Sequence, residues 1–535
     1  MERMEIKMAS MDKPFIPDFY REKDIFVTGA TGFMGKVLLE KLLRSCNGLR
    51  RIFVLMRAKG GASSQARLDE LLDAEIFDAL RASDPYFAQG KVIAVEGDLT
   101  LSELGLSTEH KRALWENVDI VFHSAAIVKF DEPLKSSIDM NVLGTRRLLQ
   151  LCQGMVKLKA FVHVSTAYCN CDKEDVAEII YPPPFDPQSV IDALSWMDDA
   201  LVEAITPKLL GSRPNMYTFT KALAETLVAE ERGTLPVAIV RPSIVTAAWR
   251  EPIPGWIDNI NGPTGLLVAS GKGLLRSMLA DTNKAADFVP VDVVINTMII
   301  VAWYTATQRP EKTGVYHCAS GTLRKLTWGD IETIAYPLLL WHPMPNPVRY
   351  PGGSFKKSRF FNALSMFVEH RCPAQLYDCY LWLSGRKPKM VKLFTKLYKV
   401  MVSLEYFTTH EWRFNCTNLL GLLQEISPAD RKMFCIDLRL LNWGHYFKDY
   451  VIGTRKFVLK EDPSTVPEGR NKLRRLYIYQ QLLYVGLVVF VWRLIMYKSK
   501  SACRLWRAVV SLFLPLLSLV SSVLGLPCSE DIPKA

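Results

Sequence analysis

The sequence lacks paired cysteine motifs. Its 11 cysteines are odd in number and scattered, and no CxxC pair is matched by a second one. Zinc sites and disulfide frameworks both need such regular spacing. We therefore expect no metal site and a reducing compartment.

The first twenty residues, MERMEIKMASMDKPFIPDFY, lack an apolar run. A secretory signal peptide requires such a run, so this segment is not expected to be one. We expect residues 1–20 to be a tail and the main folded part of the chain to face the cytosol.

The chain is too long and too apolar for one ordinary soluble core. It has 535 residues, of which 49% are hydrophobic, and the apolar excess lies at its C-terminal end. The net charge of +11 suits nucleic acid, anionic lipid or a phosphate-rich substrate, so charge alone does not choose among them. One large domain with an appendage is expected.

Between about residues 24 and 245, short β-branched runs alternate with helical patterns. The runs are DIFVT, RIFVLM, VIAVEG, DIVFHSA, AFVHVS and VAIVRP. Strands that alternate with crossover helices form a parallel sheet with helices on both faces. The predicted fold class is therefore α/β, a doubly wound parallel sheet of the Rossmann type.

After about Thr327 the pattern becomes helical and aromatic. In residues 389–404, apolar side chains fall on one side of a helix and lysines on the other. Such a helix either packs on the core as a solvated surface helix or lies on anionic lipid. The expected parts of the chain are a tail (1–20), a large α/β domain with a ligand-binding portion (21–326), a helical C-terminal domain (327–463), a linker (464–475), apolar segments suited to a membrane (476–527) and a second tail (528–535).

A glycine-rich turn follows the first predicted strand. The sequence TGATGFMG places Gly29, Gly32 and Gly35 between that strand and an apolar helix. Glycines there permit a tight turn, close approach of a pyrophosphate and packing of the helix on the sheet, and the helix N-terminus attracts the phosphates. The GxxGxxG spacing resembles that of extended short-chain dehydrogenase/reductases.

The end of the second strand carries cations where NAD-specific enzymes carry an acid. RIFVLMRAKGG offers Arg57 and Lys59 and no carboxylate. This favours binding of the 2′-phosphate of NADPH; the alternative is that Arg57 is only a solvated surface charge. Asp98 is expected near the adenine by the same resemblance, or else caps the following helix. His123 and His163 are expected to be core histidines. The expected cofactor-binding residues are Thr28, Gly29, Thr31, Gly32, Phe33, Gly35, Arg57, Asp98, Leu99, Ser124, Ala125, Lys221, Pro242 and Ile244.

Three residues are candidates for catalysis. Tyr217 and Lys221 are four residues apart in NMYTFTKALAE, so they share one helix face. Reduction of a carbonyl needs a proton donor, and a nearby ammonium is expected to lower the pKa of the tyrosine into a useful range. Thr166, after the fifth strand, is expected to hydrogen-bond the carbonyl oxygen, with Ser165 as the competing candidate.

Longer motifs carry a specific resemblance. The segments VFHSAAIVKFDEPLKSSIDMNVLGT, FVHVSTAYCN, PNMYTFTKALAE, VRPSIVTAAWREPIPGWIDNINGPTG and LNWGHYFKDYVIGTRKFVLKED resemble eukaryotic fatty acyl-CoA reductases over essentially the whole chain. This resemblance implies the reduction of long-chain acyl-CoA by two NADPH to a primary alcohol, with release of CoA and an aldehyde intermediate. The insertion between Thr166 and Tyr217 is then expected to border the acyl or CoA site.

The resemblance also implies partners and leaves two alternatives. Long-chain acyl-CoA and membrane lipid are the expected partners, with no nucleic acid, at the endoplasmic reticulum or a peroxisome. A sterol or sugar-nucleotide dehydrogenase would share the cofactor and tyrosine motifs. A non-catalytic membrane scaffold is the remaining alternative, against which the intact Tyr217 and Lys221 argue.

Two apolar runs lie near the C-terminus. Leu476–Trp492 has 17 uncharged residues and Ala508–Pro527 has 20. At 1.5 Å per residue they span about 26 and 30 Å, against a hydrocarbon core near 30 Å. Two cationic clusters flank the first run, one before it (Arg470, Lys472, Arg474 and Arg475) and one after it (Arg493, Lys498, Lys500, Arg504 and Arg507). To keep both clusters on the cytosolic side, we expect the second run to insert alone or to loop into the membrane, and the first to lie at the cytosolic interface.

Overall fold

The computed structural model describes residues 14–58, 60–499, 501, 504, 506 and 511. The chain forms two compact units, Met1–Gly469 and Arg470–Ala535. Their boundary lies inside the segment expected to be a linker. Lys59 and almost all of the apolar run Ala508–Pro527 lie outside the described residues.

A parallel sheet of seven strands forms the centre of the first unit. Every neighbouring pair is parallel. In spatial order the strands are β11 (Gly314–Cys318), β7 (Val237–Pro242), β5 (Ala160–Val164), β4 (Ile120–His123), β1 (Asp24–Thr28), β2 (Arg51–Met56) and β3 (Val92–Glu96). This sheet confirms the predicted α/β class.

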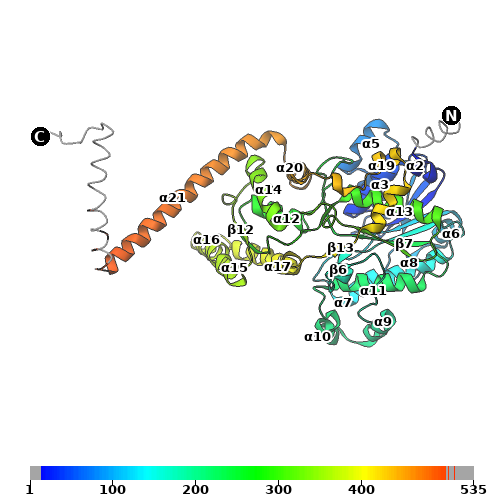
Figure 1. Ribbon diagram of the computed structural model, residues 1–535, viewed down its shortest axis with the longest axis horizontal. Coiled ribbons are helices and arrows are strands. Elements are labelled where there is room, and N and C mark those ends of the chain that lie inside the picture. The colour runs from blue at the N-terminus through cyan, green and yellow to red at the C-terminus, as the bar shows by residue number, and fades with distance from the viewer. Residues whose placement is uncertain are drawn as a thin grey trace. The chain divides into compact units, whose positions relative to one another are not determined.

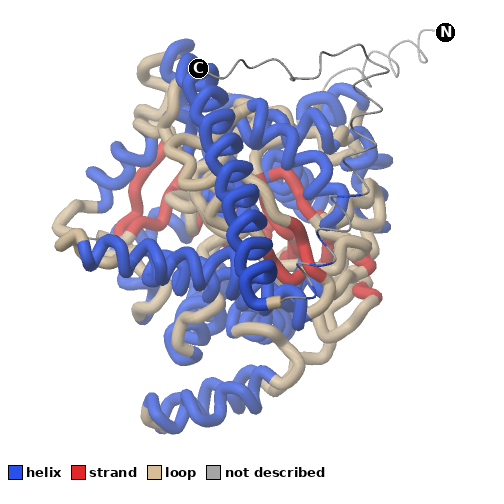
Figure 2. The backbone as a smooth tube through the Cα atoms, turned by 90° about the vertical axis from the view of Figure 1, so that its left-hand side faces the viewer, coloured by secondary structure: helices blue, strands red, loops and turns tan. Residues whose placement is uncertain are grey.

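Helices cover both faces of the sheet, because alternate side chains of each strand point to opposite faces. Ile25 and Val27 of β1 belong to one apolar core, and Phe26 belongs to the other. The first core includes α3 (Phe33–Ser45) and α13 (Val291–Gln308), and the second includes α8 (Gly144–Gln153) and α11 (Met216–Glu231). Figure 2 draws the strands in red inside this unit, with blue helices around them.

The order of the strands reverses between β1 and β4. From β1 the chain adds β2 and β3 on one side, and from β4 it adds β5, β7 and β11 on the other. In open α/β sheets, ligands bind outside the carboxyl ends of the strands at such a reversal. The loops that follow β1 and β4 are therefore the first place to look for a site.

Shorter elements complete the first half of the chain. The helices are α2 (Phe15–Tyr20), α4 (Ser64–Leu72), α5 (Asp78–Ser83), α6 (Thr108–Asn117), α7 (Leu134–Ile138), α9 (Pro187–Trp196), α10 (Asp199–Leu210) and α12 (Pro263–Gly271). Three pairs of short strands are β8 (Ile244–Thr246) with β10 (Phe288–Pro290), β9 (Ser277–Leu279) with β12 (Ser354–Lys356), and β6 (Asp175–Val176) with β13 (Arg413–Phe414).

The region after residue 327 is mainly helical, as expected. Its helices are α14 (Trp328–Trp341), α15 (Arg359–Ser365), α16 (Cys372–Leu383), α17 (Met390–Thr409), α18 (Thr417–Glu425), α19 (Pro428–Met433) and α20 (Trp443–Gly453). Its strands β12 and β13 pair with strands from the preceding region, which attaches it to the sheet domain (Figure 1).

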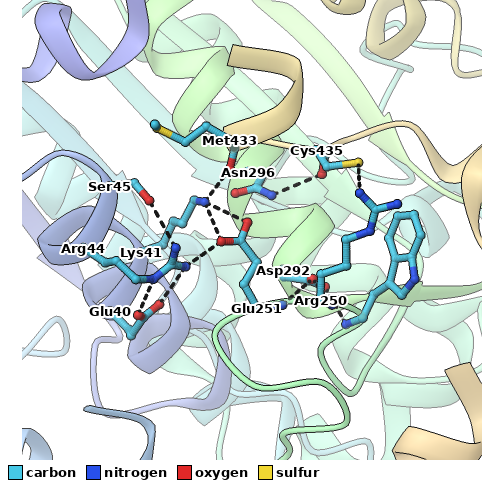
Figure 3. A network of polar contacts seen from close by, with 11 residues as sticks. Glu40, Lys41, Arg44, Ser45, Arg250, Glu251, Asp292, Asn296, Met433 and Cys435 are labelled. Atoms are coloured by element: carbon cyan, nitrogen blue, oxygen red, sulfur yellow. Dashed lines mark hydrogen bonds and ion pairs between the residues drawn. The ribbon is translucent and has the colours of Figure 1, made fainter. Parts of the chain in front are cut away.

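An ion-pair network anchors α3, the helix that begins at the glycine turn (Figure 3). Lys41 Nζ lies 2.7 Å from a carboxylate oxygen of Glu251 and donates to the Met433 carbonyl at 2.6 Å. Arg44 reaches the same Glu251 at 2.6 Å. Asp292, at the start of α13, accepts the Glu251 backbone N–H. The network thus joins α3 to three segments that are distant from it in the sequence, around residues 251, 292 and 433.

The second unit contains most of α21 (Val466–Lys498), which is 33 residues long. By length and composition, the helical segment Pro463–Lys498 could cross a membrane, with a mean hydropathy of 1.6 in its most apolar window. At 1.5 Å per residue, α21 measures about 50 Å. The uncharged run Leu476–Trp492 is therefore only part of α21, which extends beyond the run at both ends.

Candidate active site

The glycine turn after β1 is closed by contacts that only glycine allows. Gly29 has φ +77°, and a Cβ there would lie 2.6 Å from the Ala125 backbone nitrogen. A Cβ on Gly35 would lie 2.3 Å from the Gly29 carbonyl oxygen. Gly32 donates its N–H to the Gly29 carbonyl at 3.0 Å. The turn thus brings the loops after β1 and β4 together, with the N-terminus of α3 beside them.

Side chains at the ends of β1 and β4 fix this junction. Thr28 Oγ1 lies 2.8 Å from His123 Nδ1, and His123 Nε2 lies 3.0 Å from Thr145 Oγ1. Ser124 donates its hydroxyl to the Thr28 carbonyl at 2.9 Å. Burial lowers the pKa of His123 to about 3, so its ring is neutral. His123 is a hydrogen-bonded core residue, as expected.

His163 differs from that expectation in one respect. It is fully buried, and neither ring nitrogen has a hydrogen-bond partner among the described residues. Burial lowers the pKa of His163 well below its usual value, so this ring is neutral as well. Its ring centroid lies 5.2 Å from that of His123. Both histidines therefore belong to the packed interior beneath the strand ends.

Arg57 and Asp98 meet at the ends of β2 and β3. An Arg57 guanidinium nitrogen lies 3.7 Å from Asp98 Oδ2, and the arginine side chain is 51% exposed. The other oxygen of Asp98 accepts the N–H and the hydroxyl of Thr100, which makes Asp98 the cap of a tight turn. The accessible guanidinium remains available to an anionic ligand.

The other expected cofactor residues surround the same strand ends. Thr31 and Gly32 are exposed on the glycine turn, and Phe33 stacks on Trp256 with ring centroids 5.6 Å apart. Ile244 is partly exposed, whereas Pro242 is buried. The side chain of Leu99 is buried in the core, which leaves its backbone as the part that could face a ligand.

The three catalytic candidates come together where β5 ends. The Tyr217 hydroxyl is hydrogen-bonded to Thr166. Lys221, one turn farther along α11, donates its Nζ to the Val164 carbonyl at 2.7 Å. Asn215 caps this helix by accepting the Thr218 N–H at 3.0 Å. The structure therefore places all three residues beside one another, as the spacing in the sequence indicated.

Burial controls the protonation of this pair. It raises the pKa of Tyr217, although the hydrogen bond to Thr166 opposes the shift. It lowers the pKa of Lys221 to about 8. The expected lowering of the tyrosine pKa is not found, because burial is the largest influence on it and raises it. Near neutral pH, Tyr217 is a phenol that can donate a proton, and Lys221 is mainly an ammonium.

A buried ion pair supports the catalytic helix and was not anticipated. Arg241 of β7 makes a two-point contact with Glu225 at 2.8 and 2.6 Å, and both side chains are buried. Glu225 follows Lys221 by one turn and also accepts the Cys169 thiol at 3.3 Å. An arginine within the apolar run VAIVRP was the available signal, because a buried guanidinium requires a buried partner.

Asn141 is a second residue that sequence reasoning missed. Its amide exchanges two hydrogen bonds with the backbone of Ile127, at 2.8 and 3.1 Å, and also donates to Thr220 Oγ1 at 3.0 Å. It thereby joins the loop after β4 to the catalytic helix. Nothing in its local sequence distinguishes it from an ordinary helical asparagine.

An apolar pocket lies in the same compact unit. It leaves about 850 Å³ of space, part of it open to solvent, between α12, α14, α20, β9 and β12. Leu267, Met278, Ala335, Leu339 and Phe355 are among the residues that line it. Its mainly apolar lining is that of a site for an apolar ligand.

A series of contacts leads from the candidate tyrosine, Tyr217, to a strand in the wall of the pocket. The rings of Tyr217 and Phe130 have centroids 6.4 Å apart, and those of Phe130 and Phe407 are 5.8 Å apart. The next residue, Thr408, donates its hydroxyl to the carbonyl of Leu279 at 2.8 Å. Leu279 ends β9, the strand that contributes Met278 to the pocket.

Sequence comparisons identify relatives over nearly the whole chain. A family model described as male sterility protein matches residues 27–298, and another with the same description matches residues 369–461. Fatty acyl-CoA reductase 1 of Xenopus laevis is 46% identical over 503 residues, which are 94% of this chain and 98% of that protein. Fatty acyl-CoA reductase 2 of Mus musculus is 43% identical over 496 residues, 93% of this chain and 96% of that protein.

Solved structures share the fold at lower identity. The terminal R domain of the myxalamid PKS-NRPS pathway has a TM-score of 0.53 and 20% identity, over 81% of this chain and 90% of that one. The reductase domain of a non-ribosomal peptide synthetase from Mycobacterium tuberculosis has a TM-score of 0.51 and 17% identity, over 82% and 92%. These structures support the fold, and the full-length sequence relatives show that the chain belongs to the fatty acyl-CoA reductase family.

Proposed function

We propose that this enzyme uses NADPH to reduce long-chain fatty acyl-CoA to the primary alcohol, through an aldehyde and with release of CoA. The observation that carries the proposal is the grouping of Tyr217, Lys221 and Thr166 beside the glycine turn. Family membership supports the thioester substrate, which site geometry alone would not select.

A nicotinamide dinucleotide fits the residues present. Gly29 and Gly35 occupy positions where a side chain would strike the backbone, so the turn stays narrow beside the N-terminus of α3. The bound cofactor supplies hydride. We assign Arg57 to the 2′-phosphate, because its guanidinium is accessible and the end of β2 carries no carboxylate.

Side chains of α11 and of the loop after β5 are proposed to supply the proton and to position it. Tyr217, a phenol at neutral pH, donates its proton to the carbonyl oxygen as negative charge develops there. Thr166 donates a hydrogen bond to the same oxygen. Lys221 holds the cofactor ribose and supplies positive charge. In the first reduction the thioester becomes a thiohemiacetal, which expels CoA, and the same residues then serve the reduction of the aldehyde.

The apolar pocket is the proposed site of the distal acyl chain. Its apolar lining suits a hydrocarbon, and contacts from Tyr217 through Phe130 and Phe407, followed by the Thr408–Leu279 hydrogen bond, lead to β9 in its wall. Burial of methylene groups in such a pocket contributes roughly 0.8 kcal/mol each. Chain-length preference should therefore depend on how much of the pocket is open.

The enzyme is proposed to reside at the endoplasmic reticulum or a peroxisome, with its catalytic unit in the cytosol. The apolar helix α21 supports membrane association. The proposed arrangement keeps Leu476–Trp492 at the cytosolic interface and inserts Ala508–Pro527, because cationic clusters then stay on the cytosolic side.

A substrate panel tests the function directly. Membranes that contain the full chain are incubated with acyl-CoAs of graded length and with NADPH or NADH, and alcohol, aldehyde and free CoA are measured. We expect alcohol and CoA in equal amounts with NADPH, and neither with the Tyr217→Phe variant. Oxidation of a hydroxysteroid without any reduction of acyl-CoA would instead assign a sterol dehydrogenase.

A further inference from the structure

Helices α15, α16 and α17 carry an unusual concentration of exposed apolar side chains. We call residues 359–409 the helical lobe, and Figure 1 shows its three helices grouped near β12. Ten large apolar or aromatic side chains of α15, α16 and the turn between them are between 47% and 73% exposed. They are Phe360, Phe361, Leu364, Phe367, Val368, Leu376, Tyr377, Tyr380, Trp382 and Leu383. Patches of this kind on soluble proteins mark interaction surfaces.

The lobe is held in place by specific contacts on its inner side. Met366 and Met401 pack in a small apolar cluster with Leu275 and Met278, next to the apolar pocket. Asp378 accepts three backbone N–H groups at the start of α17, at 2.8 to 2.9 Å. The exposed side chains therefore lie on the outer face of an anchored structure.

Ion pairing fixes the lobe to the wall of the pocket as well. Arg276, which precedes β9, lies 3.0 Å from a Glu369 carboxylate oxygen, and its backbone N–H donates to His370 Nε2 at 3.0 Å. The three acidic residues of the lobe, Glu369, Asp378 and Glu405, are thus engaged within the fold, Glu405 in an ion pair with Arg359 at 2.8 Å. The charge left at the surface of the lobe is positive.

Lysines and arginines border the apolar face. The lobe, residues 359–409, contains eight of them against three acidic residues. Six in the turn after α16 and along α17 are exposed, namely Arg386, Lys387, Lys389, Lys392, Lys396 and Lys399. On α17 itself, Phe394, Leu397, Met401 and Leu404 pack inward. This helix therefore packs on the core through its apolar side and still presents its lysines outward, where they could contact anionic lipid.

We propose that the helical lobe docks into the surface of an anionic lipid bilayer. The apolar side chains of α15 and α16 enter the boundary between headgroups and acyl chains, and the cations of α17 contact the headgroups. Tyrosine and tryptophan prefer that boundary, and basic surfaces bind anionic leaflets. A lipid surface complements this mixture better than a folded protein does. The charged side chains around the exposed apolar residues are mostly cationic, and a bilayer, unlike a folded partner, needs no pocket of matching shape.

The rest of the chain supports the same partner. The apolar helix α21, whose uncharged run is proposed to lie at the cytosolic interface, would keep the catalytic unit close to a bilayer. The lobe would add a second, surface contact made by the catalytic unit itself. Since the inner side of the lobe packs beside the apolar pocket, docking would bring the proposed acyl site near the lipid phase.

Photocrosslinking in the full-length protein tests this proposal. A photoreactive phenylalanine derivative replaces Trp382 or, as a matched control, Trp196 of α9, which is 71% exposed against 68% for Trp382. The protein is reconstituted into vesicles of phosphatidylcholine with about a third phosphatidylserine. We expect lipid adducts at position 382 to exceed those at position 196 several-fold. Equal yields, or adducts at position 382 to protein alone, would overturn the proposal.

Charge reversal tests the contribution of the cations. With the probe at position 382, Lys392→Glu, Lys396→Glu and Lys399→Glu are combined and compared with Lys157→Glu, Lys208→Glu and Lys312→Glu. All six lysines lie on the exposed surface, so both sets make the same change in net charge. We expect the first set alone to reduce the lipid adduct several-fold. Similar losses in both sets would refute recognition of anionic lipid by the lobe.

Lipid composition provides a measurement without any charge substitution. The adduct yield at position 382 should fall several-fold in vesicles of phosphatidylcholine alone, because the anionic headgroups are then missing. An unchanged yield would contradict the electrostatic part of the proposal. Thermal melting of each variant confirms that the catalytic unit remains folded.

Discussion

Tyr217 has the protonation state that its proposed role requires. Its hydroxyl contacts Thr166, and burial keeps it a phenol. General acid catalysis typically contributes a hundredfold or more. Tyr217→Phe should therefore lose at least about a hundredfold in kcat on both acyl-CoA and free aldehyde, while NADPH still binds. Steady-state rates with each substrate and fluorescence titration of NADPH give the measurement. An aldehyde rate close to that of the unmodified enzyme would refute a single site for both steps.

The ionisation of Lys221 should make cofactor use depend on pH. Burial lowers its pKa to about 8, so the ammonium is present below that pH and is lost as the pH rises through it. If the ammonium holds the cofactor, kcat/KM for NADPH should fall above about pH 8, since this ratio reports ionisation in the free enzyme. Lys221→Arg should remove the alkaline decrease, because arginine stays charged. Persistence of that decrease in Lys221→Arg would assign it to another group.

Substitution of Arg57 tests whether this residue selects NADPH over NADH. Its accessible guanidinium lies at the end of β2, next to Asp98. Arg57→Asp would replace an attraction to the 2′-phosphate by a repulsion, so KM for NADPH should rise about tenfold or more while NADH is affected less. Parallel kinetics with both cofactors check this expectation. An unchanged ratio of kcat/KM for the two cofactors would remove Arg57 from the 2′-phosphate site.

Among the elements, α14 controls the shape of the apolar pocket. Ala335 faces the pocket, and Thr333 of the same helix is exposed. Ala335→Trp should occupy part of the space and shift preference from 16-carbon or 18-carbon acyl-CoA toward shorter chains by several-fold. Thr333→Trp is the matched control, with the same new side chain on the outer face. Because overpacking costs about 1–3 kcal/mol, melting temperatures are measured alongside. An unaltered chain-length ratio would place the acyl chain elsewhere.

The strand ends and α11 show how separate elements build the site. The glycine turn (residues 29–35), the loop after β4 (from Ser124) and the end of β5 (Val164) belong to three separate segments of the sequence, and the parallel sheet aligns their carboxyl ends. The Glu225–Arg241 pair then attaches α11 to β7 behind the catalytic residues. Removing one partner of a buried ion pair is strongly destabilising, so this contact helps to fix the catalytic helix.

For the whole molecule, the proposed membrane topology keeps both cationic clusters on the cytosolic side. A glycosylation acceptor engineered between Lys498 and Arg504 should therefore remain unmodified in microsomes. The physical reason is the cost of translocating clustered lysines and arginines. Efficient modification would instead establish a hairpin with α21 as its first span. Release of the full-length protein by carbonate would refute insertion altogether.

The sequence alone determined the class of fold and the main chemistry. Alternation of β-branched runs with helical periods reflects local geometry, so the parallel sheet was predictable from its strands. The spacing of Tyr217 and Lys221 fixes one helix face, and Gly29 and Gly35 mark a turn that excludes side chains. These features are short-range, and each can be read within a few residues.

Tertiary structure decided what depends on distant partners. Burial, which no local pattern measures, raised the pKa of Tyr217 where a lowering was expected. Asn141 and Glu225 acquire their roles only from Ile127 and Arg241 across the fold. The helical lobe likewise emerged only when its apolar residues were seen to face outward, because periodicity shows that a helix has two faces but not which face the core covers.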